Sequence, residues 1–431
     1  MSPAPPLAAP ALLLFLLQIG TLLALAVLLG RLAARLGMPQ IVGELCAGVL
    51  LGPSLLGHVA PDLSGWLFPA KHFDMLDGVG QLGMLLLVGV TGMYLDIGLL
   101  RRQGVRAAAV SVPSLILPLG LGVALGFVLP AAILPPSGDR TLFAMFLGVA
   151  LCVSALPVIA KILTELGFLH RDLGQLTIIS ASVDDVAGWL LLSVVTAMAT
   201  TGVHAGTVAT SVALLAGIVL FAVVVLRPAV KVVLRATARS AEPGVTVAVV
   251  AVLVLLCAAG TQALRMEALL GAFLCGVVVA STGLVDPARL APLRTVVLNV
   301  LAPVFFATAG LRIDLTALAR PAVAATAVAV IAVAVAGKFA GAFLGATLIR
   351  MDRWSAFALG AGLNARGVVQ IVVASVGLHA GVLSTDGYTV VVLVAIVTSV
   401  MAPPLLRLAL GRIETSPAER ERELALAGRA T

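Results

Sequence analysis

Two adjacent aspartates, Asp184 and Asp185, lie in the middle of an apolar stretch that runs from about residue 173 to residue 200. On membrane-insertion scales, one ionised carboxylate at the bilayer centre costs about 2.5–3.5 kcal/mol. A structural role rarely requires two such groups side by side. Because carboxylate oxygens bind both protons and hard cations, the pair indicates an ion or proton site. A purely structural ion pair is the alternative.

Neighbouring residues on a helix point about 100° apart, so the two carboxylates cannot easily share one partner. One can face an aqueous cavity while the other faces a cation, and two acids this close titrate as a coupled pair. Lys338 lies deep inside another apolar stretch and therefore needs a carboxylate partner or must lose its charge. We expect that partner to be Asp184 or Asp185, and a lysine that snorkels to the bilayer surface is the alternative.

Two of the apolar stretches contain residues that interrupt a helix. Pro157 removes a backbone hydrogen bond from the fifth stretch and clashes with the preceding turn. The carbonyls freed there and the hydroxyl of Ser154 can coordinate a cation. Asn364 and Arg366 interrupt the twelfth stretch in a matching position. Paired breaks predict an inverted repeat with the site at its centre, whereas a kinked but continuous helix is the simpler alternative.

The remaining polar candidates are weaker. Glu44 lies near the start of the second apolar stretch, and pairing with Arg366 is one option. For each histidine we expect a solvated loop position rather than a pH-sensing role; they are His58, His72, His170, His204 and His379. The four cysteines have no metal-ligand spacing.

The elements that position these groups are membrane spans. Of the 431 residues, 61% are hydrophobic and 11% charged, whereas a soluble domain carries about 25% charged residues. The excess apolar surface must face lipid, and a span needs about 20 mostly apolar residues. This pattern predicts an all-α membrane protein with about thirteen spans, at 11–30, 39–57, 77–99, 105–132, 141–163, 173–200, 206–226, 244–263, 267–283, 293–311, 321–349, 354–379 and 387–410.

The basic residues predict the orientation of these spans. With the N-terminus outside, 20 of the 27 Lys and Arg residues fall in cytoplasmic loops or the C-terminal tail, and 5 fall in outside loops. This is a strong positive-inside signal, so the net charge of +7 does not indicate a nucleic-acid partner. The two that remain, Lys338 and Arg366, lie inside spans. No basic residue precedes the first apolar run, so we expect that run to be retained rather than cleaved.

The motifs in these spans resemble the monovalent cation:proton antiporter superfamily. They are most similar to its second family, which includes bacterial Nap-type and Kef-type proteins and the plant cation/proton exchangers. Each motif alone is weak, but the ordered set is specific and covers about residues 15–410. It consists of Ile41–Leu45, Leu50–Gly57, Ser154–Leu163, Pro303–Leu311 and Asn364–Gly367.

The resemblance implies a homodimer in which each subunit has a scaffold and a mobile, ion-carrying core. The core would comprise about residues 105–200 and 321–410, and the scaffold about residues 11–99 and 206–311. Together they would form an exchanger domain at 1–412, followed by a short cytoplasmic tail at 413–431. We expect no cofactor and no gating by a Kef-type nucleotide-binding domain.

The resemblance also implies roles for individual residues. The Asp-Asp form looks like the electrogenic bacterial sodium/proton antiporters, in which a lysine pairs with the first aspartate. Asp185 would then carry the ion, and Lys338 would pair with Asp184. Ser154 stands where the family usually has threonine, so the hydroxyl is kept.

We therefore expect proton-coupled exchange of Na⁺ or K⁺ by alternating access in a bacterial-type inner membrane. The monovalent cation would bind at Asp185 and Asp184, with Ser154 and broken-helix carbonyls as further ligands. A cation channel, an exporter of a small organic solute on the same fold, and a transport-inactive sensor are the alternatives. No nucleophile–base set supports an enzyme. The choice between Na⁺ and K⁺ stays open, because it depends on cavity size and ligand number.

Overall fold

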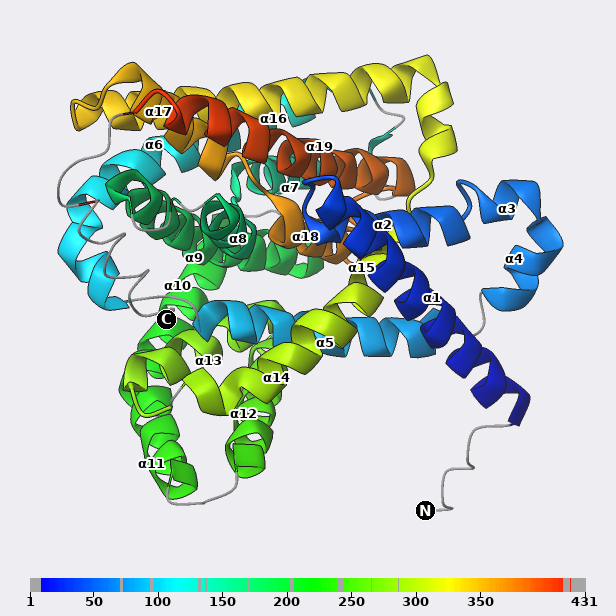
Figure 1. The fold of residues 1–431 in the computed structure, drawn as a ribbon, viewed down its shortest axis with the longest axis horizontal. Helices are drawn as coiled ribbons and strands as arrows, with labels where there is room; N and C mark the ends of the chain where they lie inside the picture. Colours follow the sequence, from blue (N-terminus) through cyan, green and yellow to red (C-terminus); the bar gives the residue numbers. More distant parts are fainter. Residues whose placement is uncertain are drawn as a thin grey trace.

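The structure is a computed structural model that describes residues 9–413, together with residue 419. It omits ten short segments, at 70–72, 94–96, 131–132, 136–137, 167, 169–170, 202–204, 239–242, 265 and 286. His72, His170, His204 and most of the expected tail therefore lie outside the described residues. Within the described part every regular element is a helix (Figure 1).

The helices follow the predicted spans closely. Ten described helices are long and apolar enough to cross a bilayer, and the other three expected spans are short or broken helices. The all-α membrane fold is thus confirmed. The principal helices are α1 (Ala9–Arg35), α2 (Gln40–Leu51), α5 (Phe73–Met93), α6 (Ile97–Val128), α7 (Arg140–Cys152), α8 (Leu156–Glu165), α9 (Asp172–Thr201), α10 (Ala205–Phe221), α11 (Arg227–Ala238), α12 (Pro243–Ala263), α13 (Ala268–Thr282), α14 (Ala291–Val296), α15 (Ala302–Gly310), α16 (Pro321–Leu348), α17 (Arg353–Leu363), α18 (Gly367–His379) and α19 (Thr385–Leu410).

The seventh span extends beyond its predicted limit. The sequence placed its end at residue 226, before Arg227 and Pro228, yet the helix continues as α11 to Ala238. A π-helical turn at Ala222–Leu226 joins α10 to α11, and the amide of Arg227 bonds to the carbonyl of Ala222. This wider turn admits Pro228, which has no N–H and would crowd the preceding turn of a regular α-helix.

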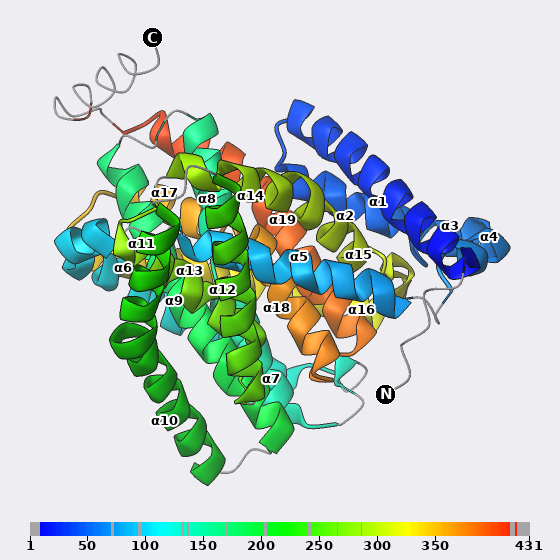
Figure 2. The same cartoon turned by 90° about the horizontal axis from the view of Figure 1, so that it is seen from below.

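Both views place α1 at one side of the molecule and α10, α11 and α12 toward the other (Figures 1 and 2). The helices α6, α7, α9, α16, α17, α18 and α19 pack on one another. At the centre of this group lie the two broken helices. Their first halves, α7 and α17, end at buried residues, and three residues separate each from its second half, α8 or α18.

Glycines set the closest helix contacts. Along α16, Gly337, Gly341 and Gly345 repeat every fourth residue and face α6. A Cβ atom at Gly341 would lie 2.5 Å from the carbonyl oxygen of Pro113. The repeat therefore lets α16 approach α6 backbone to backbone, which is how small residues pack membrane helices. This contact holds Lys338, the residue that follows Gly337, against the interior of the bundle.

Gly48 supports a comparable contact between α2 and α15, and it provides a test of this packing. A Cβ at Gly48 would lie 1.9 Å from the carbonyl oxygen of Ala307, so Gly48→Ala forces the two helices apart. We expect it to lower stability by about 1–3 kcal/mol or more, measured as a lower unfolding temperature of the detergent-solubilised protein. The control is Gly20→Ala in α1, where the added Cβ has no neighbour within 4 Å. Equal unfolding temperatures for the two variants would contradict the contact.

Candidate ion-binding site

The centre of the site is a fully buried ion pair. The Nζ atom of Lys338 in α16 donates to Oδ2 of Asp184 in α9 at 2.7 Å, and both side chains are 0% exposed. The hydroxyl of Ser114 lies 3.5 Å from the same Nζ atom. A lysine held this deep inside the bundle does not snorkel, so the expected carboxylate partner is present and it is Asp184.

Ser154 connects this ion pair to the twelfth span. Its Oγ atom lies 2.7 Å from Oδ2 of Asp184 and 2.8 Å from the carbonyl oxygen of Leu363. A hydroxyl has one hydrogen to donate and also accepts, so Ser154 can bond either oxygen and still offer a lone pair to a third group. It therefore places an adaptable polar atom beside the carboxylate.

Asp185 points away from the ion pair, as helical geometry requires. It is 1% exposed, and neither of its carboxylate oxygens has a hydrogen-bond partner among the described residues. The backbone amide of Leu156, the first residue of α8, lies near the carboxylate. Because a buried polar group without a partner is costly, Asp185 is the group in this site that most needs a ligand. A proton or a cation would satisfy it.

The two helix breaks cross beside these acids. Residues 153–155 are not helical, and the amide of Ala155 donates to the carbonyl of Ala365 at 3.0 Å, which joins one break to the other. Asn364 lies in the second break, fully buried, and both polar atoms of its side chain lack a partner in the described part of the chain. Pro157 is the second residue of α8, and its side chain lies outside the described residues. The ends of four half-helices thus converge on one place, as they do in transporter ion sites.

Arg366 supports the crossing rather than pairing with an acid. Its guanidinium is fully buried and donates to the carbonyls of Leu151 and Ala150, and also to that of Ala334 at 2.8 Å. The first two carbonyls are in the last turn of α7, where a positive charge is favourable. Arg366 therefore ties α7 to α16 and does not pair with Glu44. Glu44 lies in α2, and its side chain packs near Gly30 of α1.

The sequence analysis did not single out a cluster formed by Asp77, Arg312 and His379. The guanidinium of Arg312 pairs with the carboxylate of Asp77, and Nε2 of His379 lies 3.7 Å from the same carboxylate. The Nδ1 atom of His379 is 2.7 Å from the carbonyl oxygen of Ser375. His379 is exposed to solvent, as expected, but it also contacts a carboxylate that the sequence did not indicate. The three residues are far apart in the chain, so no local pattern could have indicated their contact.

Gln370 is a second residue that the sequence analysis missed. It lies one turn into α18, is fully buried, and has no partner for either polar atom of its amide in the described part. The signal was present in the sequence, because Gln370 is the one polar side chain between Gly367 and Ser375. Gln370 is therefore a candidate polar group of the site in the same sense as Asn364, which lies just before α18.

Two broken helices that cross at a buried acid–lysine pair define a membrane ion transporter of the antiporter class. The protein-family model described as "Sodium/hydrogen exchanger, transmembrane" matches residues 21–410 of the chain. The protein therefore belongs to the sodium/hydrogen exchanger family, which consists of transporters rather than enzymes.

Several characterised proteins resemble this chain along most of its length. It is 32% identical over 400 residues to the Na(+)/H(+) antiporter NhaS4 of Synechocystis sp., covering 91% of this chain and 96% of that protein. It is 27% identical over 406 residues to the Na(+)/H(+)-K(+) antiporter GerN of Bacillus cereus, covering 92% and 96%. With Cation/H(+) antiporter 17 of Arabidopsis thaliana the identity is 32% over 397 residues, covering 92% of this chain. The chain spans about half the length of this plant relative, 48%.

A solved structure shares the fold. The sodium proton antiporter MjNhaP1 from Methanocaldococcus jannaschii superposes with a TM-score of 0.69 at 15% sequence identity, covering 93% of this chain and 99% of that one. The predicted antiporter fold, with its discontinuous helices, is therefore confirmed.

Proposed function

We propose that this protein exchanges protons for a monovalent cation, Na⁺ or K⁺, by alternating access. The observation that carries the proposal is Asp185, a buried carboxylate beside the crossing of two broken helices, whose two oxygens have no hydrogen-bond partner among the residues that the structure describes. The similar proteins NhaS4 and GerN support cation/proton exchange, since the first is a Na(+)/H(+) antiporter and the second a Na(+)/H(+)-K(+) antiporter.

In this mechanism Asp185 binds either a proton or a dehydrated cation, and never both. When the cation enters, Asp184 turns toward it. Its Oδ1 atom has no hydrogen-bond partner in the described part of the chain and can therefore bind the cation. The bond to Lys338 then breaks, and the lysine releases a proton. Ser154 and the carbonyl of Leu363 supply neutral oxygen ligands. Oxygen ligands of this kind suit alkali cations.

The movement would carry a core, at about residues 105–200 and 321–410, against a scaffold at about residues 11–99 and 206–311. The contact between Asp77 of α5 and His379 of α18 crosses this boundary, so it must change as the two parts slide. We further propose a homodimer in a bacterial-type inner membrane, with the N-terminus outside and the C-terminus in the cytoplasm. The bias of Lys and Arg toward one set of loops supports this orientation.

Proton flux in proteoliposomes tests the exchange and identifies the cation. Purified protein is reconstituted with a pH-sensitive dye inside, and NaCl, KCl, LiCl or choline chloride is added outside. We expect proton movement on addition of Na⁺ or K⁺ and none with choline, at a fixed ratio of ions to protons. Cation flux that runs without any coupled proton movement would identify a channel and overturn the proposal.

The role of Lys338 can be tested by substituting Lys338→Gln. If Lys338 releases a proton when the Asp184 pair breaks, the wild type moves net charge in each cycle and its rate responds to an imposed membrane potential. Because glutamine carries no ionisable proton, we expect the variant to lose that response. The measurement is exchange rate against a valinomycin-set potential. An unchanged potential dependence would remove Lys338 from the mechanism.

A further inference from the structure

A cluster of charged side chains joins the proposed scaffold to the proposed core at one end of the bundle. Asp77 lies near the start of α5, Arg312 follows α15, and His379 is the last residue of α18. The guanidinium of Arg312 pairs with the carboxylate of Asp77, and Nε2 of His379 lies 3.7 Å from the same carboxylate. In the proposed orientation all three residues lie at the outer face, so we call them the outer cluster.

The hydrogen-bond partners of His379 define what a proton does there. Its Nδ1 atom lies 2.7 Å from the carbonyl oxygen of Ser375, which can only accept, so Nδ1 carries a hydrogen. In the neutral ring Nε2 therefore has a lone pair, and Nη1 of Arg312 faces it at 3.5 Å. An added proton turns Nε2 into a charged donor, which repels Arg312 and attracts the carboxylate of Asp77. Protonation thus changes the preferred partner of His379 from the guanidinium to the carboxylate.

The side chains around His379 include more acidic than basic groups. Among the described residues its charged neighbours are Asp77, Arg312 and Glu267, which directly precedes α13 and interacts with His379 electrostatically. Tyr388 of α19 is the remaining titratable group beside the cluster, and its hydroxyl carries no charge near neutral pH. Two carboxylates therefore face one guanidinium, and a protonated His379 supplies the second positive charge between them.

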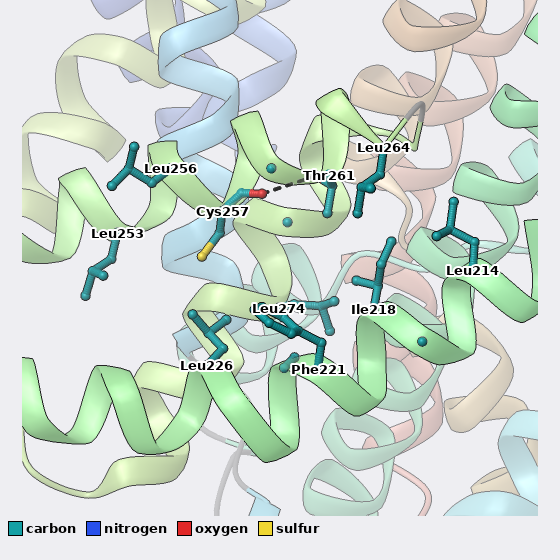
Figure 3. Close-up of a pocket in the computed structure, with 14 residues that line it drawn as sticks. Leu214, Ile218, Phe221, Leu226, Leu253, Leu256, Cys257, Thr261, Leu264 and Leu274 are labelled. Atoms are coloured by element: carbon teal, nitrogen blue, oxygen red, sulfur yellow. Dashed lines mark hydrogen bonds between the residues drawn. The ribbon is translucent and has the colours of Figure 1, made fainter.

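Glu267 is fixed in place by the contact between α12 and α13, the helices that form one wall and the floor of the apolar pocket in Figure 3. A Cβ at Gly271 would lie 2.1 Å from the carbonyl oxygen of Cys257, so the two helices meet backbone to backbone. The amide of Met266 donates to the carbonyl of Thr261 at 3.0 Å and closes the turn that connects them. Glu267 therefore stays with the proposed scaffold.

The outer cluster has members on both sides of the proposed boundary. His379 belongs to α18, which follows the second helix break, so it would move with the ion site. Asp77 belongs to the scaffold helix α5, so its contact with His379 exists only while the outer ends of core and scaffold stay together. The hydroxyl of Tyr388 in α19 bonds to the carbonyl of Ala309 in α15 across the same boundary, at 2.8 Å. Opening the outer face separates both contacts.

We propose that His379 is a regulatory proton-binding site, separate from Asp185, that holds the outer end of the core against the scaffold. With a proton, His379 pairs with Asp77 and the outer face stays closed. Without the proton only the weak contact with Arg312 remains, and the outer face opens more readily. The inference rests on the proposed exchange by alternating access and on its division into core and scaffold.

The direction of the pH effect follows from this geometry. Because the closed state binds the proton of His379 more tightly than the open state does, a low pH favours the closed state. Exchange therefore slows as the pH falls through the range around 6.5 in which histidine titrates. Competition between protons and cations at Asp185 also slows exchange at low pH, but a saturating cation concentration removes that effect.

Isotope exchange of the transported cation in proteoliposomes, at saturating concentration and at equal pH on both sides, tests the proton site. We expect the wild-type rate at about pH 5.5 to be about two- to fivefold below its rate at about pH 8, the effect of an exposed ion pair. Because glutamine binds no proton, His379→Gln should exchange at one rate across this range. The matched control is His58→Gln, at an exposed histidine of α3 (Leu56–Val59), which should behave as the wild type does.

A cross-link tests whether the outer cluster must separate during transport. Asp77→Cys with His379→Cys places two thiols across the boundary, in a protein whose accessible cysteines, Cys46 and Cys257, are replaced by serine. A short bis-methanethiosulfonate reagent bridges the two thiols. We expect cation exchange to stop and to return on reduction with dithiothreitol. Asp77→Cys alone, treated in the same way, is the control and should continue to exchange.

Two results would overturn the proposal. The wild type and His379→Gln could show the same dependence of rate on pH at saturating cation, or the cross-linked protein could exchange as fast as the untreated protein. The two experiments use different variants, so one still decides the question if the other variant fails to fold. A wild type that shows no proton flux coupled to the cation would instead overturn the proposed function itself.

Discussion

Replacing Asp185 with asparagine is expected to reduce cation-dependent proton flux to that of protein-free liposomes. The side chain keeps its shape and its burial, but an amide cannot exchange a proton for a cation at neutral pH. Both oxygens of Asp185 lack a partner among the described residues, and the side-chain oxygen of asparagine can still face the nearby backbone amide of Leu156, so we expect the fold to be kept. The measurement is proton flux in the dye-loaded proteoliposomes, alongside the unfolding temperature of the variant.

Asp62→Asn is the matched control for this experiment. Asp62 lies on the exposed surface of the short helix α4 (Pro61–Leu67), where losing one charge should leave the exchange rate unchanged. Asp185→Asn protein that folds and still exchanges cations for protons would remove Asp185 from the site. A variant that loses exchange only because it unfolds would show a lowered unfolding temperature, so the two cases are distinguishable.

The second large effect concerns the stability of the ion pair. Lys338→Met removes one partner from a pair in which both side chains are 0% exposed, and it leaves the carboxylate of Asp184 buried without a cation. Breaking a buried pair in this way typically costs about 3–5 kcal/mol. We therefore expect a clear fall in the free energy of unfolding, measured by denaturant or thermal unfolding in detergent micelles.

A double variant separates two contributions to the free energy of unfolding: the cost of burying Asp184 without a cation, and the stabilisation that the ion pair itself provides. Asp184→Asn combined with Lys338→Met removes both charges, so most of the lost stability should return. The control is Arg320→Met, which breaks the surface pair with Asp386, where the arginine side chain is 56% exposed. Such surface pairs contribute about 0–1 kcal/mol. If Lys338→Met costs no more than Arg320→Met, the buried pair is not what stabilises this part of the bundle.

The spans and their limits could be predicted from the sequence because the bilayer imposes a simple rule. Apolar length identifies a span, and basic residues orient the loops, so both signals are local. The same rule isolated Lys338 and Arg366, since a charge inside a span stands out against apolar neighbours. The predicted end of the seventh span was wrong, because Arg227 and Pro228 are residues typical of the end of a helix. A π-helical turn carries the helix past them to Ala238.

Partners were harder to predict than positions. From the sequence, Asp184 and Asp185 were both possible partners of Lys338, and Glu44 was a possible partner of Arg366, since every buried charge needs compensation. The structure places Lys338 on Asp184 and satisfies Arg366 with main-chain carbonyls of α7 and α16. The Asp77, Arg312 and His379 cluster had no local signal at all. Contacts between distant segments depend on how the helices pack, and no short stretch of sequence determines that packing.

Asp184 and Asp185 show most clearly what the sequence determined and what only the tertiary structure decided. By itself the sequence determined that two carboxylates share a span and that the helix turns them about 100° apart, because burial cost and helical geometry need only local information. Only the tertiary structure decided that Asp184 meets Lys338 and Ser154, and that the oxygens of Asp185 have no hydrogen-bond partner among the described residues. The deciding factor is the close approach of α16 to α6 through glycine and the crossing of the two breaks. Both depend on distant segments, since Lys338 is 154 positions from Asp184 and Leu363, beside the second break, is 209 positions from Ser154.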